Sequence, residues 1–501
     1  MANLGVSADG QAKLLACGAA PALVALAGEG VVNGSADAAQ YVARALANLR
    51  ASADGQAKLL TCGAAPALVA LAGEGVVKAN AGAAQWIARA IANLGDNSDD
   101  GKARLLACGA APALLTLAGK GIVKSSAGAV KQVMRAMAYI AFSADGKAAL
   151  LARGVARALA ALGGEGVVKG SSGAAQYVAM AMANLSNSDD GQAKLLASGA
   201  APALVALADE GVVKGSAGAA EWVAQAIANL GFSADGQAKL LACGAAPALV
   251  ALAGEGVVRG SADAAQYVAW AIVHLGISAD GLAKLLACGA APAVVALAGE
   301  GVVKGSAGTA EYVARAMANL GFSADGVAKL LACGAAPALV ALAGEGAVKG
   351  SAGAAQEVAC AMVNLGASVD GQAELLASGA APALVALAGE GVVKGSADAV
   401  QYVAMAMARL GISADGQAKL LACGAAPALV ALAGEGVVKG SADAAQSVAC
   451  AIYSLCCLPA AKAALVVQGA QLALTALAAQ PAVAASPVAA EWVGKARARL
   501  Q

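Results

Sequence analysis

Apolar residues along this chain recur with the period of an α-helix, and glycine and proline interrupt them at regular intervals. After Ser35, the apolar stripe from Val42 to Leu49 keeps the spacing i, i+3, i+4 and i+7, which places it on one helix face. Ser35 is a suitable N-cap for this helix, which is expected to run to about Leu49. Such a stripe has to be buried against another element.

Two shorter helices are expected ahead of this one. The first begins at a Ser7 or Asp9 N-cap and ends at Gly18, a residue type that commonly follows a helix C-terminus. The second is expected over Ala22–Ala27, with Pro21 at its first position, where proline fits best. The glycine-rich stretch GEGVVKGS then breaks the helical pattern, and we predict a structural loop there.

This three-helix pattern repeats with a period of about 45 residues, so the chain is a tandem array. Ten copies cover residues 7–457 and start at residues 7, 52, 98, 143, 188, 233, 278, 323, 368 and 413. The interval from 52 to 98 is one residue longer, and Asp96 is expected to be a loop insertion there. Residues 458–501 form a diverged copy expected to cap the C-terminal end. Residues 1–6 are interpreted as the tail of a truncated copy.

A single copy cannot bury its own apolar stripe, so the copies are expected to stack into an all-α solenoid. The composition agrees with this, because 60% of residues are hydrophobic but only 3% are aromatic, and small side chains allow close helix packing.

The net charge of +1 argues against a generic nucleic-acid binder. No apolar run reaches the ~20 residues of a membrane span, and no secretory signal is visible. A cytoplasmic or nuclear protein without a membrane segment is therefore expected.

The stretch LLACGAAPALVALA followed by AAQYVARALANL resembles the armadillo repeat, whose Gly-Ala-x-Pro-x-Leu-Val core is present at residues 18–24. The resemblance covers nearly the whole chain. It implies a right-handed superhelical solenoid with three helices per repeat, in which the third helices line the concave face. It also implies that an asparagine near the end of each third helix binds the backbone of an extended peptide. Here that position holds Asn48, Asn93, Asn184, Asn229, Asn319 and Asn364, with His274 in one repeat.

Two further positions share this helix face. Four residues before the asparagine stand Arg44, Arg89, Arg135 and Arg315, and only Trp270 matches the tryptophan typical of the importin alpha branch, which disfavours a nuclear-import role. A basic stretch at Arg44, Arg89 and Arg135 favours acidic or phosphorylated segments, as in the beta-catenin branch. One turn further back is an aromatic position, occupied by Tyr41, Trp86, Tyr177, Trp222, Tyr267, Tyr312, Tyr402 and Trp492.

Several alternatives stay open. The aromatic residues at helical spacing would equally suit packing between repeats, with the arginines solvated. A single-stranded nucleic-acid-binding solenoid and a structural spacer compete with the peptide-binding scaffold. Seven of the 11 cysteines occupy one repeated site and are expected to be small buried side chains in a reducing compartment, namely Cys17, Cys62, Cys108, Cys243, Cys288, Cys333 and Cys423. No catalytic constellation, cofactor or metal site can be assembled, so an enzyme is not expected. The sequence does not indicate the partner's identity or the oligomeric state.

Overall fold

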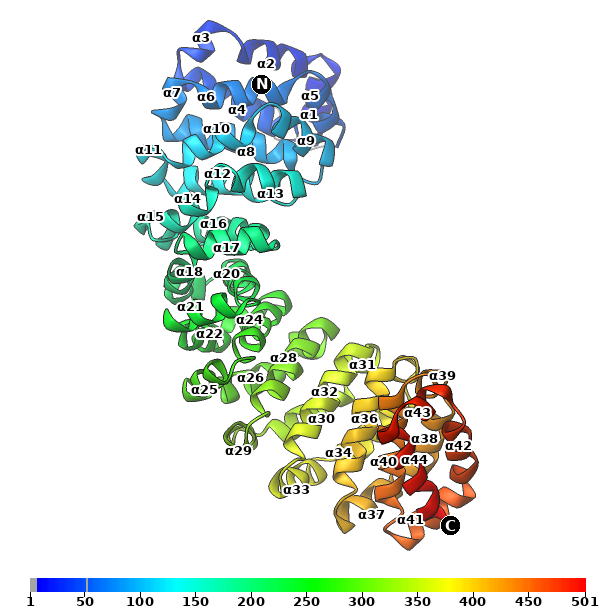
Figure 1. The fold of residues 1–501 in the computed structure, drawn as a ribbon. Helices are drawn as coiled ribbons and strands as arrows, with labels where there is room; N and C mark the ends of the chain where they lie inside the picture. The colour runs from blue at the N-terminus through cyan, green and yellow to red at the C-terminus, as the bar shows by residue number, and fades with distance from the viewer. Residues whose placement is uncertain (1–6, 51–52) are drawn as a thin grey trace. The chain divides into compact units, whose positions relative to one another are not determined.

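The computed structural model describes residues 7–50 and 53–501, and in this part of the chain it contains helices and turns but no strand (Figure 1). The expected truncated copy at residues 1–6 and the expected copy start at residue 52 lie outside the described residues. The chain divides into two compact units, Met1–Ala248 and Leu249–Gln501, called here the N-terminal and C-terminal units. Each unit is described by itself.

Third helices are the longest elements of each copy. In the N-terminal unit they are α4 (Ala36–Leu49), α8 (Ala81–Gly95), α12 (Ala127–Ile140), α16 (Ser172–Leu185) and α20 (Ala217–Leu230). In the C-terminal unit they are α24 (Ala262–Leu275), α28 (Ala307–Leu320), α32 (Ala352–Leu365), α36 (Ala397–Leu410), α40 (Ala442–Leu455) and α44 (Pro487–Leu500). Within each unit, every third helix packs against the next one along the chain (Figure 1).

First and second helices form the layer behind them. The first helices are α1 (Ala8–Ala16), α5 (Ala53–Thr61), α9 (Asp99–Ala107), α13 (Ala144–Leu151), α17 (Asp189–Ala197), α21 (Ala234–Ala242), α25 (Ala279–Ala287), α29 (Ala324–Ala332), α33 (Val369–Ala377), α37 (Ala414–Ala422) and α41 (Pro459–Val467). The second helices are α2 (Ala19–Ala27), α6 (Ala64–Gly73), α10 (Ala110–Ala118), α14 (Val155–Gly163), α18 (Ala200–Asp209), α22 (Ala245–Gly254), α26 (Ala290–Ala298), α30 (Ala335–Gly344), α34 (Ala380–Gly389), α38 (Ala425–Gly434) and α42 (Ala470–Ala478).

The expected stripe on the third helix is buried. In α4, Val42, Leu46 and Leu49 lie in the core, and the side chain of Ser35 caps the helix by accepting a hydrogen bond from the backbone N–H of Ala38. The same burial recurs in each later third helix, where alanine fills most of the remaining core positions. Stacking of these small side chains accounts for the apolar composition, as the sequence predicted.

The second helix begins earlier than expected. Gly18 adopts a left-handed conformation with φ 74°, so the chain turns within one residue and α2 starts at Ala19. Pro21 is therefore the third residue of the helix and not the first. Proline is tolerated there because the N–H groups of the first helical turn have no intrahelical acceptor.

The glycine-rich stretch between the second and third helices is not a plain loop, which corrects the prediction. It contains a short helix in every copy, because a buried valine such as Val32 fixes the turn against the core. These short helices are α3 (Gly30–Asn33), α7 (Gly75–Lys78), α11 (Gly121–Lys124), α15 (Gly166–Lys169), α19 (Gly211–Lys214), α23 (Gly256–Arg259), α27 (Gly301–Lys304), α31 (Gly346–Lys349), α35 (Gly391–Lys394), α39 (Gly436–Lys439) and α43 (Pro481–Ala485).

A second glycine position explains the recurring Ser-Ala-Asp-Gly sequence. Ser143 caps α13 through the backbone N–H of Gly146, and a Cβ atom on Gly146 would collide with the carbonyl oxygen of Ile140. Glycine thus lets the first helix start directly against the end of the preceding third helix.

Among the described residues no single helix is long and apolar enough to cross a membrane, although eight bent helix pairs would meet the criteria of length and composition together.

Candidate peptide-binding surface on the third helices

In most third helices the three predicted positions are at least partly accessible, but Asn184, Asn229 and His274 are buried. In α8, Trp86, Arg89 and Asn93 are half-buried, whereas Ile87 and Ile91 between them are fully buried. Tyr41 is the most exposed aromatic residue of the set at 59%. The other predicted aromatic residues at this position are half-buried, namely Trp86, Tyr177, Trp222, Tyr267, Tyr312, Tyr402 and Trp492.

The asparagines connect neighbouring repeats, a role that the sequence pattern did not reveal. Five of the six donate their side-chain amide Nδ2–H to a backbone carbonyl of the preceding third helix. The bonds are Asn93 to Ala47 (3.0 Å), Asn184 to Ala138 (2.9 Å), Asn229 to Ala183 (3.0 Å), Asn319 to Val273 (3.4 Å) and Asn364 to Ala318 (2.8 Å). Asn184 and Asn229 are buried. The amides therefore join adjacent helices, and their contact with a peptide stays a prediction.

Two arginines enclose one tryptophan in the N-terminal unit. The guanidinium carbon of Arg44 lies 5.3 Å, and that of Arg89 4.8 Å, from the centroid of the Trp86 ring. Burial lowers the pKa of Arg89 below its ordinary value, and the positive charges of Arg135 and Arg44 lower it further. Arg44 Nε is buried and has no hydrogen-bond acceptor among the described residues. The Arg44, Trp86 and Arg89 side chains are called the Arg–Trp–Arg cluster below.

Arg135, the third member of the predicted basic stretch, is in a different environment. Its Nη2 lies 3.8 Å from Asp96 Oδ2, and its Nε donates to the hydroxyl of Tyr139 at 3.3 Å. Asp96 also accepts from Arg50, with an Nη1–Oδ2 distance of 3.3 Å. The inserted residue Asp96 thus brings a carboxylate onto this surface, and the positive potential is concentrated at the Arg–Trp–Arg cluster.

Arg315 in the C-terminal unit is already paired. Its Nη2 lies 2.9 Å from Glu357 Oε1 and 3.1 Å from Glu311 Oε1, and its guanidinium stacks on Tyr312 at 5.2 Å. Burial alone would lower the pKa of Arg315, but the hydrogen bond and charge of Glu357 together with Glu311 raise it. This arginine therefore offers an incoming anion much less net charge than Arg44 or Arg89 does.

Aromatic side chains gather around Trp270. Its ring centroid lies 5.7 Å from Tyr267, 5.8 Å from Tyr312 and 5.5 Å from His274. Burial, followed by the charge of Arg315, lowers the pKa of His274, so the imidazole is neutral near pH 7. The predicted residues Tyr267, Trp270, His274 and Tyr312 thus form one cluster, which supports the packing alternative for this part of the surface.

Sequence reasoning missed a set of exposed apolar residues, each three residues after the asparagine position of its repeat. Each stands one residue before a serine N-cap. The set comprises Phe142 (64% exposed) and Phe232 (70%) in the N-terminal unit, and Ile277 (63%), Phe322 (85%) and Ile412 (61%) in the C-terminal unit. We call it the apolar rim. The signal was present in the recurring GFSADG and GISADG sequences, in which a large apolar residue occupies a turn.

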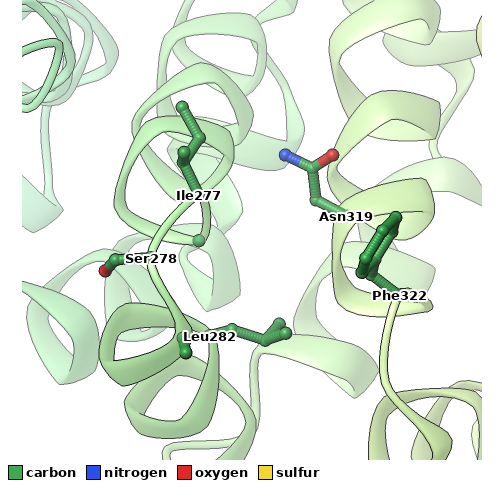
Figure 2. Close-up of a pocket in the computed structure, with 7 residues that line it drawn as sticks. Ile277, Ser278, Leu282, Asn319 and Phe322 are labelled. Carbon is green, nitrogen blue, oxygen red and sulfur yellow. The ribbon is translucent and has the colours of Figure 1, made fainter.

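A cavity of ≈ 430 Å³ lies between consecutive members of the apolar rim. Figure 2 shows it between Ile277 and Leu282 on one side and Asn319 and Phe322 on the other. Besides the Asn319 amide and Ser278, the side chains that line this space are apolar. The third-helix surface therefore combines polar groups with a border that can contact apolar side chains.

The cysteines differ from the expectation. Cys17, Cys243 and Cys288 are exposed, because the residue after the first helix points away from the core. Cys62, Cys108, Cys333 and Cys423 at the same site are half-buried, so the prediction that this site is buried is wrong in all seven copies. All 11 cysteines are free thiols. Among the described residues, no group of three or more histidine, cysteine, aspartate or glutamate side chains could hold a metal ion.

The similarities of this chain to known proteins are similarities of structure and not of sequence. No protein-family model matches the chain, and no curated protein matches its sequence. A crystal structure of an engineered protein from the Northeast Structural Genomics Consortium is similar with a TM-score of 0.69 and 17% identity over 87% of this chain and 98% of that one. A structure from work on a phosphorylation switch that controls the interaction between cadherin and beta-catenin is similar with a TM-score of 0.67 and 12% identity, covering 96% of this chain and 90% of that one. In fold, the chain is an all-α, armadillo-like helical solenoid.

Proposed function

We propose that this chain is a non-catalytic protein-binding scaffold that binds an extended acidic or phosphorylated segment across its third helices. The observation that carries the proposal is the Arg–Trp–Arg cluster, in which two guanidinium groups lie close to one indole ring. Structural similarity to a protein of the cadherin and beta-catenin interaction supports a role in protein binding. Similarity to an engineered protein of the same fold agrees with a scaffold.

The charges of neighbouring arginines favour the binding of an anion. Arg89 is near Arg44 and Arg135, and this repulsion is relieved when an anion binds. A guanidinium held against an aromatic ring keeps its donors at the ring edge, where a carboxylate or phosphate can accept two parallel hydrogen bonds. The buried Arg44 Nε would gain an acceptor at the same time.

The remaining third-helix surface suits an extended chain. Apolar side chains of a ligand can contact the apolar rim, while its backbone passes over the half-buried aromatic positions. Because the anion-binding groups are concentrated in the first two repeats, the acidic or phosphorylated part of the ligand is expected there.

The test uses three 12-residue peptides of glycine, aspartate, glutamate and serine that differ at one central residue, which is phosphoserine, serine or lysine. Affinities are measured by isothermal titration for the intact chain and for the Arg44→Gln/Arg89→Gln variant. We expect the phosphoserine peptide to bind most tightly and the variant to lose about tenfold or more in affinity for it.

Arg153→Gln/Arg157→Gln is the matched control. It removes the same number of charges from the same unit, but both arginines are exposed, Arg153 in the turn between α13 and α14 and Arg157 on α14. Equal losses in the two variants, or equal affinity for all three peptides, would reject the proposal. Binding of a single-stranded oligonucleotide in preference to the peptides would favour the nucleic-acid alternative instead.

A further inference from the structure

One third helix in the C-terminal unit, α40, has small side chains at all three of the repeated third-helix positions, and two of them, Cys450 and Ser454, line a cavity. In α40 the aromatic position is Ser447, the next position is Cys450 and the asparagine position is Ser454. The preceding third helix has Tyr402, Met405 and Arg409 at these places, and α44 has Trp492, Lys495 and Arg499. Ser447 is buried, and the small side chains of Cys450 and Ser454 leave a space between the bulkier residues of the two neighbouring helices.

That space is a cavity of ≈ 520 Å³, within the usual range for ligand sites. Its floor includes Cys450 and Ser454, and its walls include Met405 and Ile412 on one side and Trp492 on the other. Trp492 is held edge-on by Tyr453, with ring centroids 5.7 Å apart. The cavity is therefore shaped by packed aromatic and aliphatic groups on two sides.

The replacement of asparagine by Ser454 in this repeat helps to keep the cavity open. In other repeats the asparagine crosses to the preceding third helix, but Ser454 donates its hydroxyl to the carbonyl of Ala451 in its own turn, at 2.9 Å. Ser454 Oγ also lies 2.7 Å from the position that a Cβ atom on Gly411 would take, so the serine hydroxyl packs closely against this glycine. The short side chain of Ser454 therefore leaves the walls apart, and its hydroxyl already has a hydrogen-bond partner.

The charged side chain that lines this cavity is positive. Among the described residues that line it, Arg409 is the only charged side chain, and it is exposed. Arg499 lies beside the cavity, where its guanidinium donates to the hydroxyl of Tyr453 at 3.2 Å and to Cys457 Sγ at 3.1 Å. Burial raises the pKa of the Cys450 thiol, so this residue adds no negative charge near pH 7.

We infer that this cavity binds a large apolar side chain of an extended peptide segment, with a carboxylate beside that side chain paired to Arg409. The apolar walls receive the side chain, and the adjacent positive charge selects the carboxylate over an amide. The inference rests on the proposed peptide-binding function and names a second anchor for it, separate from the Arg–Trp–Arg cluster.

The test follows indole N–H signals in a chain with ¹⁵N-labelled tryptophan. There are four tryptophans, and replacing Trp86, Trp222 and Trp270 one at a time with phenylalanine assigns Trp492 by elimination. The probes are the capped peptides acetyl-Gly-Phe-Asp-Gly-amide and acetyl-Gly-Phe-Asn-Gly-amide. We expect both to shift the Trp492 signal, and the aspartate peptide to bind about threefold more tightly, as befits an exposed ion pair.

Two variants define the site. Cys450→Met/Ser454→Asn fills the cavity with residues that occur at the same positions in other repeats, so it is expected to fold, and it should weaken both probes about tenfold or more. Arg409→Gln should remove the preference for the aspartate probe, whereas Lys439→Gln, which removes a charge from α39 in the same unit, should keep it.

A Trp492 shift that persists in the filled variant would overturn the inference. So would a response at Trp270 in place of Trp492, or a Trp492 signal that changes with protein concentration alone, which would mean that a second copy covers the cavity. Failure of the proposed function can be distinguished from failure of this inference. The capped probes contain no phosphate, and the Trp86 signal reports phosphopeptide binding at the Arg–Trp–Arg cluster.

Discussion

Asn184 on α16 donates its side-chain amide to the carbonyl oxygen of Ala138 on α12 at 2.9 Å, and its side chain is only 3% exposed. The bond joins two successive third helices. Asn184, one of the predicted peptide-binding residues, therefore also helps to pack one repeat against the next. Because its substitution can affect both peptide binding and stability, the two have to be measured separately.

Asn184→Ala is expected to lower the free energy of unfolding by about 1–3 kcal/mol, because the buried carbonyl of Ala138 loses its donor. Asn33→Ala is the control, since Asn33 bonds only within its own exposed turn, to the carbonyl of Gly28. Urea denaturation midpoints measure both variants. Equal midpoints for Asn184→Ala and Asn33→Ala would show that the bond between repeats contributes no stability.

Gly146→Ala is expected to destabilise the fold by about 1–3 kcal/mol, since the new Cβ atom would collide with the carbonyl oxygen of Ile140 and shift the start of α13. Gly166→Ala places the same methyl group where no atom lies within 4 Å and should be nearly neutral. Thermal unfolding of the two variants makes the comparison. A neutral Gly146→Ala would contradict the close contact between α12 and α13.

His274 is the only histidine, so its protonation can be followed without ambiguity. Its pKa in the folded chain is lowered, first by burial and then by Arg315, so the unfolded chain takes up the proton more readily. Its contribution to stability is therefore present above about pH 6.5 and is lost as the pH falls through the lower folded pKa. Imidazole NMR titration checks the direction of the shift. His274→Asn should flatten this part of the stability profile, and an unchanged profile would refute the assignment.

Phe322 is 85% exposed, so Phe322→Ser should change the free energy of unfolding by no more than about 0.5 kcal/mol. Leu320 lies two residues earlier and is 1% exposed, and Leu320→Ala should cost about 2–5 kcal/mol. Chemical denaturation distinguishes the two. A large loss for Phe322→Ser would mean that the apolar rim belongs to the packed core and is not a contact surface.

The sequence predicted the fold well where a single period controls it. The stripe from Val42 to Leu49, the Ser35 cap and the left-handed turn at Gly18 all follow from local spacing, and the structure has them. Local spacing did not predict the short helix around Val32, because that turn is fixed by burial against the core and not by helix propensity.

The surface was predicted less completely because its details depend on contacts between repeats. The sequence indicated which residues share a helix face, but not that Asn184 bonds the preceding repeat or that Asp96 lies between Arg50 and Arg135. The apolar rim was readable from the repeated Phe/Ile-Ser-Ala-Asp-Gly pattern. It went unnoticed because an apolar residue next to a helix cap is ordinarily assigned to the core.

The most direct test of the central claim is a double-mutant cycle between Arg89 and the phosphoserine of the bound peptide, measured by isothermal titration. The cycle compares the intact chain and Arg89→Gln with the phosphoserine and serine peptides. If Arg89 recognises the anion, the coupling free energy will be about 1.5–3 kcal/mol, as for hydrogen bonds to charged groups. A coupling free energy indistinguishable from zero would contradict the account, because the phosphate would then bind elsewhere on the chain.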